Sequence, residues 1–182
     1  MTRLPRRCRS KDEEGGFTLV ELIITVVITA ILSTIAIQIY QNIITKSHQR
    51  EASTLLNAYL KGIKSYHIET GSQPTMPEHL REHVSVIGCK VYDYQACKSG
   101  NQVNPSGNRK WKSPSGLYEI ALGQDTDSQG GAVSYLTAIP RGDFESEGLP
   151  VYACYNLTTG VTSLSLIGVS GVDIPRWTHR CK

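Results

Sequence analysis

Residues 15–45 read GGFTLVELIITVVITAILSTIAIQIYQNIIT, and this stretch decides the fold of the chain. Between Glu21 and Lys46 lie 24 residues without a charged side chain. A helix needs about 20 mainly apolar residues to span the hydrocarbon core of a bilayer, and it pairs its backbone groups internally. The stretch therefore predicts a membrane-spanning helix rather than a strand.

The leader, residues 1–16, has five basic and three acidic residues, a net charge of +2. Positive charge before an apolar helix predicts a cytoplasmic N-terminus, with the rest of the chain across the membrane. A secretory signal places its small residues after the apolar run, whereas Gly15 and Gly16 precede it here. A cut after Gly16 would keep the helix on the mature protein. A plain single-pass anchor with a Gly-Gly joint is the alternative.

Glu21 places a carboxylate at the start of the apolar stretch, which costs roughly 3 kcal/mol if the group has no partner. A cut after Gly16 would create an amine at Phe17, four residues earlier and on the same face of a helix. We expect Glu21 to neutralise this amine or that of a neighbouring copy.

Three hydroxyl residues follow Glu21 at intervals of four, at Thr25, Thr29 and Ser33. They form a narrow polar stripe on one side of the predicted helix. Either the hydroxyls bond back to carbonyls one turn earlier, or the stripe is a seam for close helix–helix packing.

Residues 46–70 continue the helix with an amphipathic pattern. No proline interrupts residues 17–73, and Gly71 with Pro74 provides a stop signal. One helix of about 50 residues is expected, and its second half needs a partner surface in the same chain. The apolar positions of that half are Ala52, Leu55, Leu56, Tyr59, Leu60 and Ile63.

The region 117–182 is expected to supply this surface. Four short β-type runs lie at 117–122, 132–139, 151–157 and 161–167, and a turn at 158–160 suggests a hairpin. The predicted fold class is α+β, with the long helix packed on a four-stranded antiparallel sheet. Residues 71–116 are expected to form a long connecting loop.

The chain has five cysteines, so they cannot all pair internally. Removal of the leader would take away Cys8 and leave four, which allow three pairings: the cysteines are Cys89, Cys97, Cys154 and Cys181. A four-cysteine metal site is the weaker alternative, because no CxxC pair is present.

Other candidate chemistry is sparse. His79 and His83 are four apart, but no third metal ligand is obvious, and a solvated helix face is expected. Asp125 and Asp127 precede two glycines and are expected in a turn rather than a Ca²⁺ loop. With no nucleophile–base set or phosphate-binding loop, we expect no enzyme activity, cofactor or metal.

Two basic–aromatic clusters could contact DNA, although the chain carries a net charge of only +3. A strongly electrostatic nucleic-acid binder is excluded by so small a charge. We expect DNA binding to be weak and a solvated face or subunit contact to be the main use of these clusters. They are Arg109, Lys110, Trp111 and Lys112, and Arg176, Trp177, Arg180 and Lys182.

Residues 16–21, GFTLVE, resemble the prepilin peptidase motif of type IV pilins and related pseudopilins. The resemblance covers residues 15–45. It implies a cut after Gly16, N-methylation of Phe17 and a role for Glu21 in assembly, and Tyr40 matches a common tyrosine of the family. Many members have glycine where this chain has Ala30, and a kinking proline where it has Gln38.

The resemblance implies the pilin fold and a structural subunit that polymerises through its apolar helix. Implied partners are other pilin subunits in a homopolymer or mixed filament, the peptidase/methyltransferase and the inner-membrane assembly machinery. The subunit would be in the bacterial inner membrane first, then in a surface pilus or a periplasmic pseudopilus.

We favour the pair Cys89–Cys97, which closes a local loop, and the pair Cys154–Cys181, which ties the C-terminal segment to a strand. The second pair resembles a disulfide common near the C-termini of type IV pilins. A type II secretion pseudopilin is the first alternative, and a membrane-anchored binding protein that does not assemble is the second. Motility, adhesion, competence and secretion are all compatible roles.

Overall fold

The computed structural model describes residues 17–166 and residue 181. The chain divides into two units, residues 1–42 and 43–182, and the long helix α1 (Leu19–Thr70) contributes to both. α1 is the one described helix with the length and apolar composition needed to cross a membrane. Its helical hydrogen bonding continues through Gln38, where the proline found in many pilins is absent.

The end of α1 follows from its sequence. Gly71 adopts a positive φ of 68°, a backbone conformation that glycine accepts without strain. Its N–H donates to the carbonyl of His67 at 2.8 Å, which closes the last turn. Pro74 follows and cannot continue a helix.

Among the described residues, seven strands form one antiparallel sheet, in the order β2-β1-β3-β4-β5-β6-β7. The prediction of four strands was therefore wrong in number. β4 (Tyr118–Thr126), β5 (Ala132–Pro140), β6 (Val151–Asn156) and β7 (Thr162–Leu166) correspond to the four predicted runs. The other three lie within residues 71–116: β1 (Gly88–Cys89), β2 (Gln102–Val103) and β3 (Lys110–Lys112).

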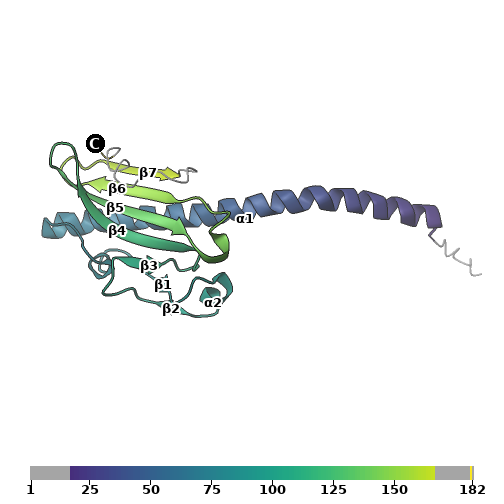
Figure 1. Cartoon of the computed structure of the whole chain (residues 1–182), viewed down its shortest axis with the longest axis horizontal. Helices are drawn as coiled ribbons and strands as arrows, with labels where there is room; N and C mark the ends of the chain where they lie inside the picture. Colours follow the sequence, from purple (N-terminus) through teal and green to yellow (C-terminus); the bar gives the residue numbers. More distant parts are fainter. Residues whose placement is uncertain (1–16, 167–180, 182) are drawn as a thin grey trace, which may run out of the picture. The chain divides into compact units, whose positions relative to one another are not determined.

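The segment that holds these extra strands also contains the short helices η1 (Pro77–Leu80) and α2 (Tyr94–Lys98), and η2 (Gly142–Phe144) joins β5 to β6. Figure 1 shows β4 to β7 side by side, with β3, β1, β2 and α2 at one side. Strands of two or three residues are too short to show an alternating pattern, which explains why the sequence did not reveal them.

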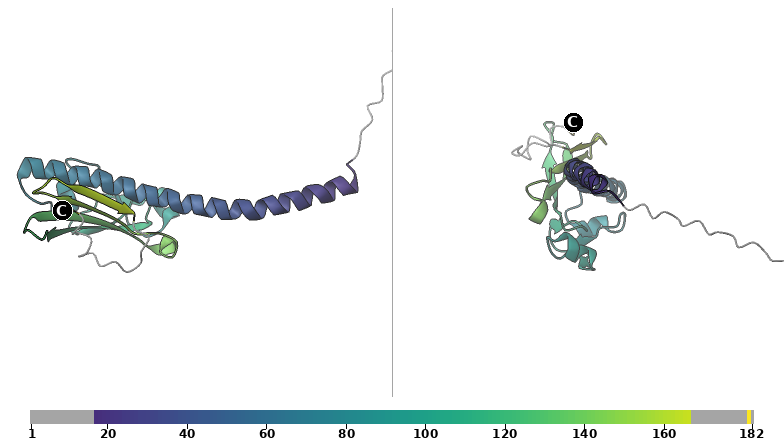
Figure 2. Two further views of the ribbon diagram at one scale, coloured as in Figure 1. Left: turned by 90° about the horizontal axis from the view of Figure 1, so that it is seen from above. Right: turned by 90° about the vertical axis from the view of Figure 1, so that its right-hand side faces the viewer.

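Within the second unit, residues 43–70 of α1 lie along one face of the sheet (Figure 2). The core between them joins apolar side chains of the helix to those of the strands. At the centre Leu56, Tyr59 and Ile63 are fully buried. Partners on the strands are Trp111, Ile120, Leu122, Leu136, Ala138, Val151, Ala153 and Tyr155.

Candidate functional site

The start of α1 is held by a reciprocal pair of side chains, Thr18 and Glu21. The Glu21 carboxylate accepts hydrogen bonds from the N–H and the hydroxyl of Thr18, at 3.0 and 2.9 Å. The Thr18 hydroxyl in turn accepts from the N–H of Glu21 at 3.2 Å. This is a capping box, and it explains why the helix begins at Leu19.

Phe17 lies before the first helical residue and is 83% exposed. In the uncut chain Phe17 therefore does not share a helix face with Glu21, and the pairing of Glu21 with an amine at Phe17 after cleavage stays a prediction. Glu21 instead has Thr18 as its partner. The spacing Thr-x-x-Glu was visible in the sequence, and its capping role was missed there. Gly16 lies outside the described residues.

The hydroxyl stripe bonds back to the helix itself. The hydroxyl of Thr25 donates to the carbonyl of Leu22 at 2.9 Å, and that of Thr29 to the carbonyl of Thr25 at 2.9 Å. The hydroxyl of Ser33 donates to the carbonyl of Thr29 at 2.7 Å. Each hydroxyl is thus satisfied within the helix, and each still presents a small side chain outward.

Apolar side chains between residues 17 and 44 are exposed in the chain on its own. Val27, Leu32 and Ile39 are 52%, 60% and 54% exposed, and Tyr40 is 65% exposed. The described side chains of residues 17–44 are all exposed. Exposed apolar surface of this extent is typical of contact with lipid or with other protein chains.

The structure joins Cys89 to Cys97 and Cys154 to Cys181, the pairs favoured from the sequence. Their Cα atoms are 5.7 and 6.1 Å apart, within the usual range for a disulfide. Cys181 is fully buried with Cys154 and Val133 on the sheet, in a small second core.

A buried amide supports this second disulfide. Asn156 is fully buried, and its amide donates to the carbonyl of Cys181 at 2.9 Å and to the Asp127 carboxylate at 2.8 Å. Its side-chain oxygen accepts from the N–H groups of Thr158 and Thr159. Asn156 therefore connects the end of the chain to two turns of the sheet.

Asp127 has local partners, as expected of a turn. It accepts hydrogen bonds from the N–H groups of Gln129 and Gly131, at 2.9 and 2.6 Å. Among the described residues, no group of three metal-ligating side chains is present.

The two histidines His79 and His83 also have local partners. The ring of His79 stacks on Tyr66 with centroids 5.3 Å apart, and the same ring of Tyr66 meets His83 edge-on at 6.0 Å. The His83 side chain lies 3.5 Å from the Glu69 carboxylate. Here the two histidines pack η1 and the turn after it against α1.

The first basic–aromatic cluster is divided between two sides of β3. Trp111 is 7% exposed and packs edge-on against Tyr59, with centroids 5.7 Å apart. Its indole therefore cannot stack on a nucleotide base, because it belongs to the core. Burial there raises the pKa of the Tyr59 hydroxyl to about 12. The second cluster, residues 176–182, lies outside the described residues.

Glu119 organises the charged side of β3. Its carboxylate accepts a hydrogen bond from Tyr92 at 2.9 Å and lies 3.6 Å from both Lys110 and Arg141. Burial by itself would raise the pKa of Glu119, but the Tyr92 hydrogen bond and the two cations outweigh it and lower the pKa. Lys112 lies over the Tyr92 ring, 4.7 Å from its centroid. Glu119 thus neutralises part of the basic cluster.

The family described as prokaryotic N-terminal methylation motif matches residues 13–37. Fimbrial protein EcpC of Eikenella corrodens is 34% identical over 64 residues, which is 35% of this chain and 42% of that protein. The chain thus spans less than half the length of this curated relative. No solved structure matches. The methylation motif and the fimbrial relative together support the resemblance of this chain to a type IV pilin-like prepilin.

Proposed function

We propose that this protein is a structural subunit of a type IV pilus-like filament. In this proposal the precursor is inserted in the bacterial inner membrane, cleaved after Gly16, N-methylated at Phe17 and polymerised through its apolar helix. The observation that carries the proposal is the exposed apolar surface of residues 17–44, directly after the methylation motif.

The physical driving force is burial of that surface. Outside lipid, each Val, Leu or Ile side chain fully removed from water contributes roughly 1.5–3 kcal/mol, and residues 22–37 alone contain ten of them. A bundle of such helices would provide the burial that a single chain does not. The proposed division is a leader at 1–16, a filament-core helix at 17–45, an amphipathic half at 46–70, a connecting segment at 71–116 and the rest of the sheet in 117–182.

Partners in this proposal are further pilin subunits, a prepilin peptidase that also methylates, and an inner-membrane assembly machinery. Glu21 would guide a subunit into the growing filament, and the stripe of Thr25, Thr29 and Ser33 would be a seam between helices. The hydroxyls bond back to their own helix, which is the first of the two alternatives given for the stripe, and the seam stays a proposal. Back-bonding leaves a seam open, because satisfied small side chains allow two helices to approach closely.

The first test is the mature N-terminus in the cells that make this protein. N-terminal mass spectrometry is expected to find N-methylated Phe17, and electron microscopy is expected to find filaments that disappear when the gene is deleted. An intact leader on the mature protein would contradict the proposal and favour a plain membrane anchor. Filaments confined to the periplasm would favour a pseudopilus.

The second test concerns Glu21. The variant Glu21→Ala is expected to be cleaved normally and to assemble at least about tenfold less, because it removes the carboxylate to which the proposal assigns entry into the filament. Thr18→Ala is the matched control, since it weakens the same capping box and keeps the carboxylate. Equal loss in both variants would assign Glu21 to helix capping rather than to assembly.

A further inference from the structure

The outer face of α1 in the second unit carries a basic stripe. Arg50, Thr54, Asn57, Lys61 and Lys64 follow one another at intervals of four and three residues, and all five are exposed. This spacing keeps them on one side of a helix, roughly opposite the buried positions Ala52, Leu56, Tyr59 and Ile63. The stripe has three cations and no acidic residue, and no ion pair involves these cations among the described residues.

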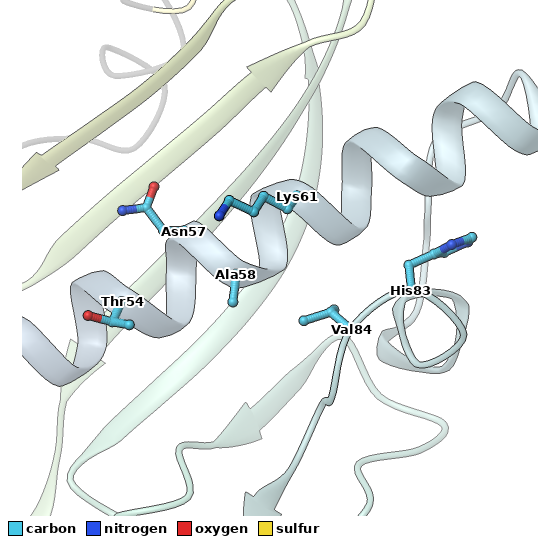
Figure 3. Close-up of a pocket in the computed structure, with 6 residues that line it drawn as sticks. All are labelled: Thr54, Asn57, Ala58, Lys61, His83 and Val84. Atoms are coloured by element: carbon cyan, nitrogen blue, oxygen red, sulfur yellow. The ribbon is translucent and has the colours of Figure 1, made fainter.

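The middle of the basic stripe borders a hollow of about 640 Å³. Thr54, Asn57 and Lys61 line it from α1, and His83 and Val84 line it from the segment after η1 (Figure 3). Gly62 brings these two elements together, because a Cβ at this position would meet Val84 at 2.6 Å. The hollow is therefore built into the packing of the second unit, which we call the head.

A loop of opposite charge lies elsewhere in the same unit. Residues 142–148, GDFESEG, contain three acidic side chains, Asp143, Glu145 and Glu147, and all three are exposed. Glu145 lies 3.4 Å from Arg141, while Asp143 and Glu147 form no ion pair among the described residues. Phe144 is buried and anchors this acidic loop.

The acidic loop cannot contact the basic stripe of its own chain, because the two lie on different sides of α1. Phe144 packs edge-on against His48, with centroids 5.3 Å apart, which places the loop on the side of α1 that carries His48. His48 precedes Ala52 by one turn on the buried side, whereas Arg50 is roughly 200° away around the helix. One copy thus presents two complementary surfaces in different directions.

We infer that the acidic loop of one copy docks on the basic stripe of a second copy of this chain, at the hollow that Lys61 borders. The contact joins two different surfaces, so each copy can bind one neighbour through its acidic loop and another neighbour through its basic stripe. Such heterologous contacts propagate into helical filaments when they do not close into a ring. The inference rests on the proposed function and names the surfaces through which heads meet. A solvated helix face is the ordinary alternative.

The positions of the acidic loop and the basic stripe along α1 predict how far neighbouring copies with parallel helices are displaced from each other. The loop lies at the level of residue 48, and the cations lie between residues 50 and 64. At 1.5 Å per residue, neighbouring copies would be displaced along the helix by about 3–24 Å. Charge complementarity in such a contact mainly determines the partner and the register.

The test is a charge swap in full-length protein in its own cells, with shed filaments quantified against membrane-bound subunit. Lys61→Glu/Lys64→Glu and, separately, Asp143→Lys/Glu147→Lys are each expected to lower the filament yield at least about tenfold. The two pairs combined are expected to restore the yield to within about threefold of wild type, because opposite charges again meet. Lys90→Glu/Lys98→Glu, with two exposed lysines elsewhere, is the matched control and is expected to assemble normally.

The outcomes separate this inference from the proposed function. Wild-type filaments together with unaffected single reversals would overturn the inference and leave the proposed function standing. Two damaging reversals that the combination does not rescue would also overturn it, because the stripe would then meet another acidic partner. Absence of filaments from wild-type cells that process the protein would overturn both. Immunoblots under non-reducing conditions confirm that each variant accumulates with its disulfides intact.

Discussion

The two halves of α1 use apolar side chains in opposite ways. In residues 19–42 they point outward all round the helix and are exposed, whereas between Ala52 and Ile63 they lie mainly on one side and are buried or half-buried under the sheet. The first pattern leaves the single chain with a surface that only lipid or other chains can cover. The second pattern stabilises the fold of the individual subunit.

The first prediction compares how truncation of one leucine from each half of α1 changes the free energy of unfolding. Leu56→Ala is expected to lower the free energy of unfolding of the head by about 2–5 kcal/mol, because Leu56 is fully buried and its truncation leaves a cavity. Leu32→Ala, at a residue that is 60% exposed, is expected to change it by less than about 0.5 kcal/mol. Urea unfolding of the detergent-solubilised chain, followed by near-UV circular dichroism, measures both. Equal changes in the two variants would contradict the conclusion that only the second half of α1 stabilises the fold of the single subunit.

The second prediction concerns the disulfides, which occur only in the head among the described residues. Cys154→Ser/Cys181→Ser is expected to destabilise the head by about 3.5 kcal/mol, because the bridge closes a long loop in the unfolded chain. The Cys89–Cys97 bridge closes a loop of 8 residues rather than 27. Cys89→Ser/Cys97→Ser is therefore expected to lower the free energy of unfolding by a smaller amount, about 2.5 kcal/mol. The same urea unfolding compares them, and a larger loss from the shorter loop would contradict the loop-entropy account.

The sequence predicted the long patterns of this fold and missed the short ones. An uncharged run of 24 residues and four β-type runs carry strong periodic signals, and α1 and β4 to β7 correspond to them. β1, β2 and β3 have two or three residues each and depend on pairing with distant strands. No local pattern encodes such pairing, so a loop was expected there.

At the candidate site, sequence reasoning found the residue types more reliably than their orientation. The sequence predicts one surface cluster that includes Lys110, Trp111 and Lys112, whereas alternation along β3 places the middle side chain on the other, buried face. Asn156 was not singled out at all. Its importance comes from burial beside Cys181 and Asp127, a juxtaposition of positions 25 and 29 residues apart in sequence.

The third prediction tests that buried amide. Asn156→Ala is expected to destabilise the head by about 1–3 kcal/mol, because it leaves the N–H groups of Thr158 and Thr159 and the carbonyl of Cys181 without their partner. Asn57→Ala, at an exposed position of α1, is the matched control and is expected to be nearly neutral. Thermal unfolding measures the two, and a neutral Asn156→Ala would show that water replaces the amide.

The fourth prediction has the smallest effect and concerns the pH dependence of the head. The pKa of Glu119 is lowered in the folded protein from its usual 4.5. Its interactions with Tyr92, Lys110 and Arg141 therefore stabilise the fold above the usual pKa, and this contribution is lost as the pH falls through the lowered pKa. Glu119→Gln is expected to be less stable than wild type by about 1 kcal/mol at neutral pH.

The sign of this difference follows from proton binding. Around the usual pKa the unfolded chain binds the proton more readily than the folded one, so acid favours unfolding of wild type and not of Glu119→Gln. The gap between the two unfolding curves is thus expected to close as the pH falls from the usual pKa of 4.5 through the lowered pKa of the folded protein. Glu82→Gln, at an exposed position, is the control and should track wild type throughout. A gap that persists at the lowest pH would assign the loss to packing of the amide rather than to the charge of Glu119. It would also remove the electrostatic link between β3 and β4 from the account of head stability.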